Sequence, residues 1–229
     1  MHFLGLKMMA DFWKDTVKCP ICGNEFMFSK VSSQAIKVKE RDIDLKPIYK
    51  GVNPLKYSLI TCPHCYFTFN EKDAENIKNE IKELHFSKIQ DFLKTLSEKD
   101  MKGLDNYDTK DLDFYKKQIV IASEIYSILE KPFEVSRLLL KLSWVYREEN
   151  DEKRELKILN NILKINNKFY ESADNDRETI FLLFYDSYIN YRLGKKEEAA
   201  KNIERLVRNY SKTKSPYIKA AKELRGELK

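Results

Sequence analysis

Two C-x-x-C pairs constrain the fold of this 229-residue chain more than any other feature of its sequence. Two residues between cysteines let both thiolates of a tight turn point at one metal ion, and two such turns complete a tetrahedral site. We therefore predict a structural Zn²⁺ site whose ligands are the four cysteines of the chain, Cys19, Cys22, Cys62 and Cys65. A redox pair or another thiophilic metal are the alternatives, because one C-x-x-C pair is enough for disulfide exchange.

A closed site with four protein ligands leaves no coordination position for a substrate, so we expect no metal-based catalysis. His64 lies between two of the predicted ligands and is expected to point outward. The three histidines of the chain have no evident serine or cysteine partner for nucleophilic catalysis. We therefore predict no catalytic residues, and an enzyme is an alternative through the segment between the two cysteine pairs.

Short stretches of period-two hydrophobicity flank the cysteine pairs and predict strands. They cover residues 25–30, a half-buried stretch at 36–39, and residues 56–60, which lead into the second pair. Gly23 follows the first pair, where the turn needs a residue that adopts positive φ. These features predict a small β-rich, zinc-ribbon-like domain over residues 1–70, with a long insert between the pairs.

The insert holds six residues that we treat as a candidate polar site: Arg41, Asp42, Asp44, Tyr49, Asn53 and Tyr57. A long segment without periodicity is often functional. Asp42 and Asp44 would share one face of a strand and could bind a metal as paired carboxylates. The structural alternatives are a solvated polar face or a buried ion pair with Arg41.

Basic and aromatic residues interleave along the insert, an arrangement typical of faces that bind phosphates and stack bases. The basic residues are Lys37, Lys39, Arg41, Lys46, Lys50 and Lys56. The net charge of +6 is a mild bias, and acidic residues at positions 40, 42 and 44 interrupt the basic run. Nucleic-acid binding by this domain is therefore an alternative function, second to protein binding.

From residue 70 onward the hydrophobic period changes from two to 3.6, which predicts helices. Residues 71–109 are expected to form a linking helix, or two helices broken near His85, followed by a connector at 100–109. In the second case Ser87 and Gln90 would form a capping box. The connector is the predicted boundary to the C-terminal part.

Residues 110–229 hold successive amphipathic segments with short turns, the last opened by Ser215 and Pro216. Two stretches that start 44 residues apart fit the spacing of tetratricopeptide repeats. Glu155 and Asp186 fall where that repeat takes an apolar or small residue. The predicted fold class is mainly α, with the small N-terminal β-rich domain and a C-terminal antiparallel tetratricopeptide-like array of six helices. An ordinary α-bundle is the alternative.

Segments in both parts of the chain carry a resemblance to one family. They are Phe12–Lys14, Cys19–Phe26, Arg41–Asp44, Asn53–Tyr57, Cys62–Cys65, Leu142–Arg147 and Tyr191–Ala199. With these segments the chain resembles the bacterial domain-of-unknown-function family 2225 over about residues 9–210. The resemblance implies a C-P-x-C…C-P-x-C part joined to tetratricopeptide-like helices, and it implies no activity. Members commonly carry Gly-Tyr after the last cysteine, whereas Tyr66 follows it directly here.

No apolar run approaches the roughly 20 residues that a membrane-spanning helix needs, and the first residues lack the pattern of an export signal. We therefore expect a cytoplasmic protein without membrane association, in a compartment where cysteine pairs bind metals more often than they form disulfides. The predicted function is a non-catalytic protein-interaction or scaffold protein, with a protein partner on the helical array. The sequence carries no signal for an oligomeric state.

Overall fold

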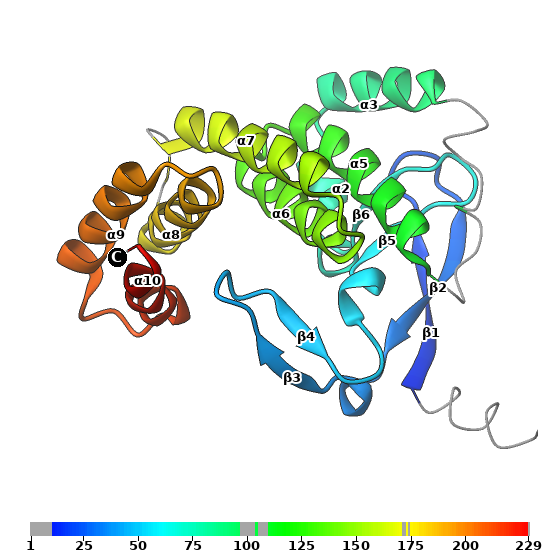
Figure 1. Ribbon diagram of the computed structural model, residues 1–229. Coiled ribbons are helices and arrows are strands. Elements are labelled where there is room, and N and C mark those ends of the chain that lie inside the picture. The colour runs from blue at the N-terminus through cyan, green and yellow to red at the C-terminus, as the bar shows by residue number, and fades with distance from the viewer. Residues whose placement is uncertain (1–10, 97–103, 105–109, 171–172, 174, 229) are drawn as a thin grey trace, which may run out of the picture. The chain divides into compact units, whose positions relative to one another are not determined.

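The computed structural model describes residues 11–96, 104, 110–170, 173 and 175–228. As predicted, these residues form short antiparallel hairpins in the N-terminal part and mainly helices after residue 77 (Figure 1). They fall into two compact units, which are described separately below. The first unit comprises the residues up to 39 together with 49–138, and the second comprises residues 40–48 together with those from 139 onward.

Two antiparallel hairpins carry the cysteine pairs in the first unit. Strand β1 (Phe12–Lys18) pairs with β2 (Glu25–Val31), so that the last residue of β1 lies opposite the first residue of β2. Strand β5 (Leu59–Thr61) pairs with β6 (Thr68–Asn70) in the same manner. The strand predicted at residues 25–30 is confirmed, whereas the sequence reasoning missed β1.

The predictions for the insert between the hairpins were partly wrong. Strand β3 (Val38–Arg41) pairs with β4 (Pro47–Tyr49), but β3 is exposed along its whole length instead of half-buried. Val38 is 44% exposed, so the period of two did not mark a buried face here. Residues 56–60 do not form one strand, because a 3-10 turn η2 (Pro54–Tyr57) precedes β5. The Asn53 side chain begins this turn by accepting a hydrogen bond from the Leu55 N–H at 3.0 Å.

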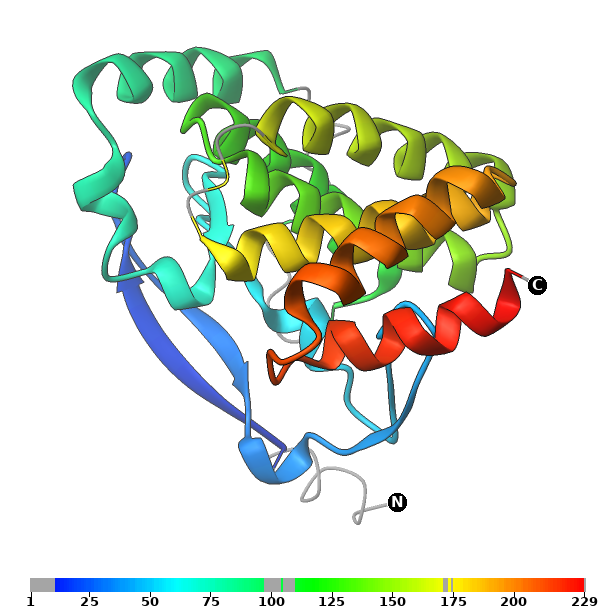
Figure 2. The ribbon, with the colours of Figure 1, turned by 90° about the vertical axis from the view of Figure 1, so that its left-hand side faces the viewer.

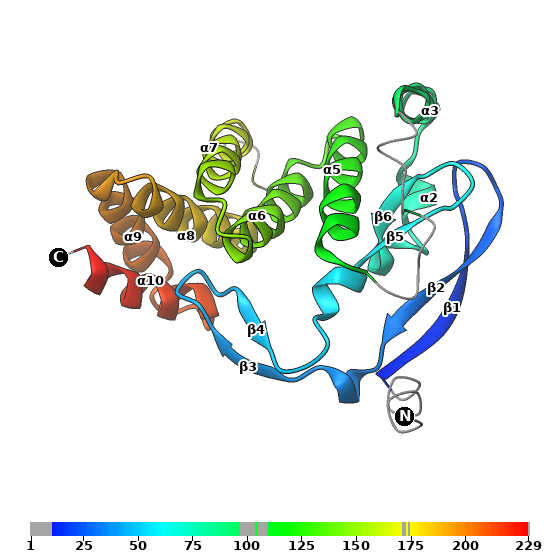
Figure 3. The same cartoon turned by 45° about the vertical axis from the view of Figure 1, so that its right-hand side comes forward.

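Helix α5 (Leu112–Ile128) packs against β5 and β6 and completes the core of the first unit (Figure 3). The fully buried apolar side chains of this core include Leu59, Ile60, Phe67, Phe69, Ile119 and Ala122. The Tyr126 hydroxyl accepts a hydrogen bond from the Asn70 N–H at 3.0 Å and donates one to Asp73. These bonds fix the helix to the residues at the end of β6.

The segment after β6 contains two helices, α2 (Ile77–Glu80) and α3 (Glu83–Thr95). The predicted break exists, but it lies at residues 81–82, where the backbone is extended, and not near His85. Ser87 therefore lies inside α3, and the predicted capping box is wrong. The predicted connector at residues 100–109 lies outside the described residues, apart from the buried Leu104.

The second unit contains helices α7 (Glu152–Phe169), α8 (Asp176–Arg192), α9 (Lys196–Tyr210) and α10 (Pro216–Glu227). It also contains the C-terminal half of α6 (Pro132–Glu148), whose first residues belong to the first unit. Helix α8 contacts α7, α9 and α10 (Figure 2). Every residue from 180 to 190 is buried. Its apolar side chains point in all directions, which is typical of a helix at the centre of a core.

The same turn follows α6 and α8. Asn150 and Gly194 both adopt positive φ, at 58° and 76°, and in each turn the next residue donates a backbone hydrogen bond across the end of the helix. These two turns are 44 residues apart, as are the two stretches that fit the repeat spacing. Such turns end many helices, and the same one follows α5, where Glu130 has a φ of 56° and the Lys131 N–H bonds to the Tyr126 carbonyl. The tetratricopeptide assignment therefore stays a prediction. The predicted cap at Ser215 is confirmed, because its side chain accepts a hydrogen bond from the Tyr217 N–H.

Among the helices that the structure describes, none combines the length and the apolar character needed to cross a membrane.

Candidate metal centre

Each cysteine pair lies in the loop of one hairpin, and the two loops have the same backbone conformation. In the first loop the Cys19 N–H bonds to the Asn24 carbonyl, and the Gly23 N–H bonds back to the Cys19 carbonyl, both at 2.9 Å. In the second loop Cys62 and Tyr66 make the equivalent bonds at 2.9 and 2.8 Å. Gly23 and Tyr66 have nearly equal positive φ values of 76° and 62°. The loops are therefore two copies of one turn, and the second forms without the glycine that the first one uses.

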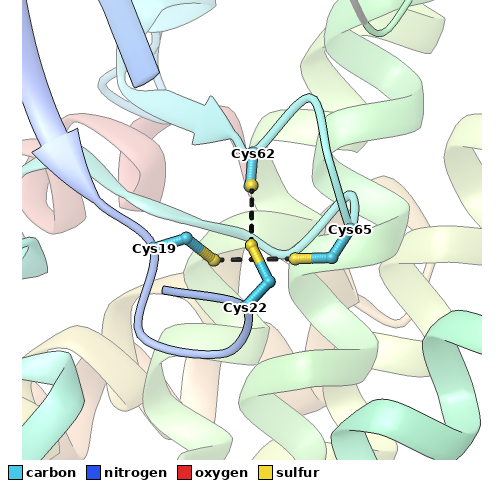
Figure 4. Close-up of side chains that lie close together, drawn as sticks. All are labelled: Cys19, Cys22, Cys62 and Cys65. Carbon is cyan, nitrogen blue, oxygen red and sulfur yellow. Dashed lines mark hydrogen bonds between the residues drawn. The ribbon is translucent and has the colours of Figure 1, made fainter. Parts of the chain in front are cut away.

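The two loops bring all four sulfur atoms together (Figure 4). The Sγ atoms lie within 4.8 Å of one another, with 3.6 Å between Cys19 and Cys65 and 3.6 Å between Cys22 and Cys62. A regular tetrahedron of sulfurs around Zn²⁺, with Zn–S bonds of about 2.3 Å, has edges of about 3.8 Å. Disulfide sulfurs are about 2.05 Å apart, and all four cysteines are free. The arrangement fits four ligands of one metal ion.

The four thiols are close enough to shift the pKa values of one another. Contact with Cys19 lowers the pKa of Cys62, and the reciprocal contact raises the pKa of Cys19. Contact with Cys19 and Cys62 also raises the pKa of Cys65. Thiolates this close repel one another, so they cannot all carry a negative charge unless a positive ion lies between them. His64 is exposed, as predicted, and stays outside the set of four sulfur ligands.

Two polar side chains that the sequence reasoning missed hold β5, the strand that leads into the second pair. The Lys110 ammonium donates to the Leu59 carbonyl at 2.8 Å, and the Gln118 amide donates to the same carbonyl at 3.2 Å. Gln118 also donates to the Thr61 hydroxyl at 2.9 Å. Because Thr61 precedes Cys62 directly, these bonds position the second turn from the side of α5.

The residues of the candidate polar site are divided between the two units. Asp44 is fully buried in the second unit, where its carboxylate pairs with Arg147 at 2.9 Å. Asp42 lies 3.6 Å from the same guanidinium group. Arg41 donates to the Leu45 carbonyl at 3.2 Å instead of pairing with either aspartate. A buried ion pair therefore exists at Asp44, as one of the alternatives predicted, but its cation is Arg147 of α6 and not Arg41.

The other three candidate residues belong to the first unit. Asn53 caps η2, and the Tyr57 ring lies 4.9 Å from the Phe12 ring. The Lys110 ammonium lies over the Tyr57 ring at 5.4 Å from its centroid. Tyr49 ends β4 and is half-buried. Asn53 and Tyr57 therefore have structural roles in the first unit.

A buried ionic network in the second unit also escaped the sequence reasoning. Arg147 donates to Asp44, to Glu155 at 2.8 Å and to the Tyr188 hydroxyl at 2.6 Å. Arg192 donates to the other oxygen of Glu155 at 2.9 Å. Burial is the largest single effect on the pKa of Arg147 and acts to lower it, but the contacts with Asp44, Tyr188 and Glu155 together outweigh burial, and the pKa is raised. The misfit of Glu155 in the repeat pattern was the signal that could have revealed the network.

Comparisons with known proteins match the sequence of the chain to a bacterial family. The family model described as "Uncharacterized protein conserved in bacteria (DUF2225)" matches residues 12–228. A relative from Borreliella burgdorferi, described as "Uncharacterized protein", is 29% identical over 87 residues, which are 34% of this chain and 31% of the relative. The chain thus matches about a third of the length of this curated relative. No solved structure matches the chain.

Proposed function

We propose that this chain, which belongs to the bacterial DUF2225 family, is a non-catalytic cytoplasmic interaction or scaffold protein stabilised by a structural Zn²⁺ ion. The observation that carries the metal assignment is that the loops of two equivalent hairpins bring four sulfurs within 4.8 Å of one another, with two contacts of 3.6 Å. Four sulfur ligands in this geometry are typical of zinc or an iron–sulfur centre. Zn²⁺ bound by four thiolates would hold the two hairpins together and leave no position for a substrate.

The sulfur contacts favour a metal over a redox pair. Both 3.6 Å contacts join a cysteine of the first loop to a cysteine of the second. Disulfide exchange at a C-x-x-C motif uses the two cysteines of one motif. The observed pairing across the loops is what a shared ion requires.

Two alternatives that the sequence left open receive less support. An enzyme with paired carboxylates in the insert would need Asp42 and Asp44 to be available, whereas both face Arg147. A nucleic-acid face would use the basic residues of the insert, but Lys46 is buried and pairs with Glu148 at 3.0 Å. The proposal therefore places partner binding on the helices, whose stacked arrangement leaves large side-chain surfaces for a protein.

Metal analysis of the purified protein tests the first half of the proposal. We expect about one zinc per chain, lost in Cys62→Ser and retained in the matched control His64→Ala, which alters the exposed neighbour between two ligands. Chelation should unfold the hairpins of the first unit, because metal binding supplies folding free energy to such sites. A fully folded, metal-free protein, or iron in place of zinc, would refute the assignment.

Affinity capture from native lysate, with and without nuclease, tests the second half. We expect a protein partner that survives nuclease treatment and is retained by the triple variant Lys37→Gln, Lys39→Gln and Lys50→Gln. Phosphate contacts weaken steeply with salt, so a protein partner should also persist at physiological ionic strength. Capture that nuclease abolishes would replace this proposal with the nucleic-acid alternative.

A further inference from the structure

The turn at the tip of the β3–β4 hairpin, residues 42–46, inserts an acidic side chain into the helical part of the second unit. Asp44 is 0% exposed, and one of its carboxylate oxygens accepts hydrogen bonds from the Trp144 indole at 2.8 Å and from Arg147 at 2.9 Å. The Tyr185 hydroxyl donates to the Asp44 backbone carbonyl at 3.2 Å. The helices thus bind both the side chain and the backbone carbonyl of Asp44 in this turn.

Polar contacts, more than apolar packing, hold the turn in place. Ile43 and Leu45, which flank the buried aspartate, are only half-buried, and the adjoining strand β3 is exposed along its length. Two backbone hydrogen bonds, from Asp42 to Lys46 and from Leu45 to Asp42, close the turn. Leu45 has a φ of 63°, a conformation that side chains other than glycine rarely adopt. The turn is anchored by the buried carboxylate of Asp44 and by the buried Lys46, which pairs with Glu148 at 3.0 Å, so polar contacts hold it as they hold a bound peptide.

Removing the turn would take Asp42 and Asp44 away from Arg147, and it would take Lys46 away from Glu148, with which it pairs at 3.0 Å. Arg147 and Arg192 share Glu155 between them, so the three side chains have one positive charge in excess. The Arg147 side chain is 21% exposed and stacks over the Tyr188 ring at 5.6 Å from the centroid. Without Asp44, the Trp144 indole N–H and one N–H group of Arg147 would lose their shared acceptor. Buried donors without an acceptor are unfavourable, so the vacated site would favour another carboxylate.

We propose that Trp144, Arg147 and Tyr185 form a carboxylate-binding site for an acidic segment of a partner protein, and that the chain's own turn at residues 42–46 fills this site in the absence of the partner. The inference rests on the proposed interaction function and assigns the kind of partner: a protein with an aspartate in an exposed turn. Arg147 and Trp144 bind the carboxylate, and Tyr185 binds the backbone carbonyl of the same aspartate. The partner and the internal turn compete for the same donors.

Binding of a labelled peptide that spans residues 37–50 tests the proposal in the full-length chain, with fluorescence anisotropy as the readout. The variant Asp44→Ala removes the internal anion, and it should bind this peptide roughly tenfold or more tightly than the wild type, because the competing occupant is gone. Binding should be lost when the peptide itself carries Asp44→Ala, and also when Arg147→Met is added to the protein. Asp91→Ala, which removes an exposed carboxylate on α3, is the matched control and should bind like the wild type.

Hydrogen exchange of the wild type decides the question even where Asp44→Ala fails to fold. Saturating peptide should increase the exchange of the backbone amides of residues 40–48, because the turn is released. Unchanged exchange there, together with no gain in peptide affinity in any folded Asp44→Ala protein, would show that the turn is a permanent structural element. A nuclease-resistant partner captured alongside that negative result would leave the interaction function standing and refute only this site.

Discussion

Lys110 offers the sharpest test of the energetics of the first unit. Its side chain is 5% exposed, and its ammonium donates to the Leu59 carbonyl and lies 5.4 and 5.5 Å from the ring centroids of Tyr57 and Phe114. Burial lowers its pKa from the ordinary 10.5 to about 7. Removing the ammonium while keeping the length of the side chain, in Lys110→Met, should therefore change how the stability of the protein depends on pH.

The direction follows from proton uptake on unfolding. Between pH 7 and 10.5 the unfolded chain holds the proton on Lys110, whereas the folded chain does not, so the free energy of unfolding rises with pH in this window. Each pH unit contributes about 1.4 kcal/mol, so the full rise is about 5 kcal/mol, and roughly 1.5–2 kcal/mol of it falls between pH 7 and 8.5. Below pH 7 the charge stays buried, and the rise is absent.

Urea unfolding at pH 7, 7.75 and 8.5, followed by helical circular dichroism, measures this difference for the wild type and Lys110→Met. The variant should gain stability relative to the wild type as the pH falls toward 7, because it buries no charge. Metal binding also depends on pH, but it affects both proteins and leaves the difference between them. Lys94→Met, at a side chain that is 74% exposed, is the control. Equal pH slopes for wild type and Lys110→Met would refute the assignment of a charge-burial penalty to Lys110.

Three further substitutions probe the second unit. Burial raises the pKa of Asp186 to about 7, although the Asn166 amide donates to its carboxylate at 2.6 Å. The free energy of unfolding of the wild type should therefore fall as the pH rises from 4 to 7, because the buried carboxyl group becomes charged. In urea unfolding, Asp186→Asn should be nearly as stable as the wild type at pH 4 and more stable at pH 8, by at most about 4 kcal/mol. Leu206→Ala, at a fully buried position of α9, should lower the free energy of unfolding by about 2–5 kcal/mol, and a near-wild-type melting temperature would mean that α9 is not packed as described. Gly194→Ala should lower the free energy of unfolding by about 1–2 kcal/mol, because alanine is strained at a φ of 76°. No clash adds to this strain, since no atom lies within 4 Å of the added Cβ. An unchanged melting temperature would contradict the left-handed turn.

Local patterns in the sequence were enough to predict the cluster of four cysteines and most of the helices. The two C-x-x-C pairs define a turn within a few residues, and the helix boundaries at Ser215 and at the turn through Gly194 follow from caps that act over one helical turn. These features depend on neighbouring residues, so they can be read along the chain. The exposed strand β3 shows the limit of such patterns, because period two gives the alternation of side chains but not whether another layer covers them.

The pairing of buried charges was decided by the tertiary structure alone. Asp44 follows Arg41 by three positions in the sequence, but its carboxylate binds Arg147, which lies 103 residues away. Lys110 and Glu155 look like surface residues in a chain that is 34% charged, and only the packing of the helices buries them. The sequence determined which turns and helices form, because those interactions are local. The partners of a buried charge depend on which distant segments the fold brings together, because desolvation makes an unpaired buried charge unfavourable.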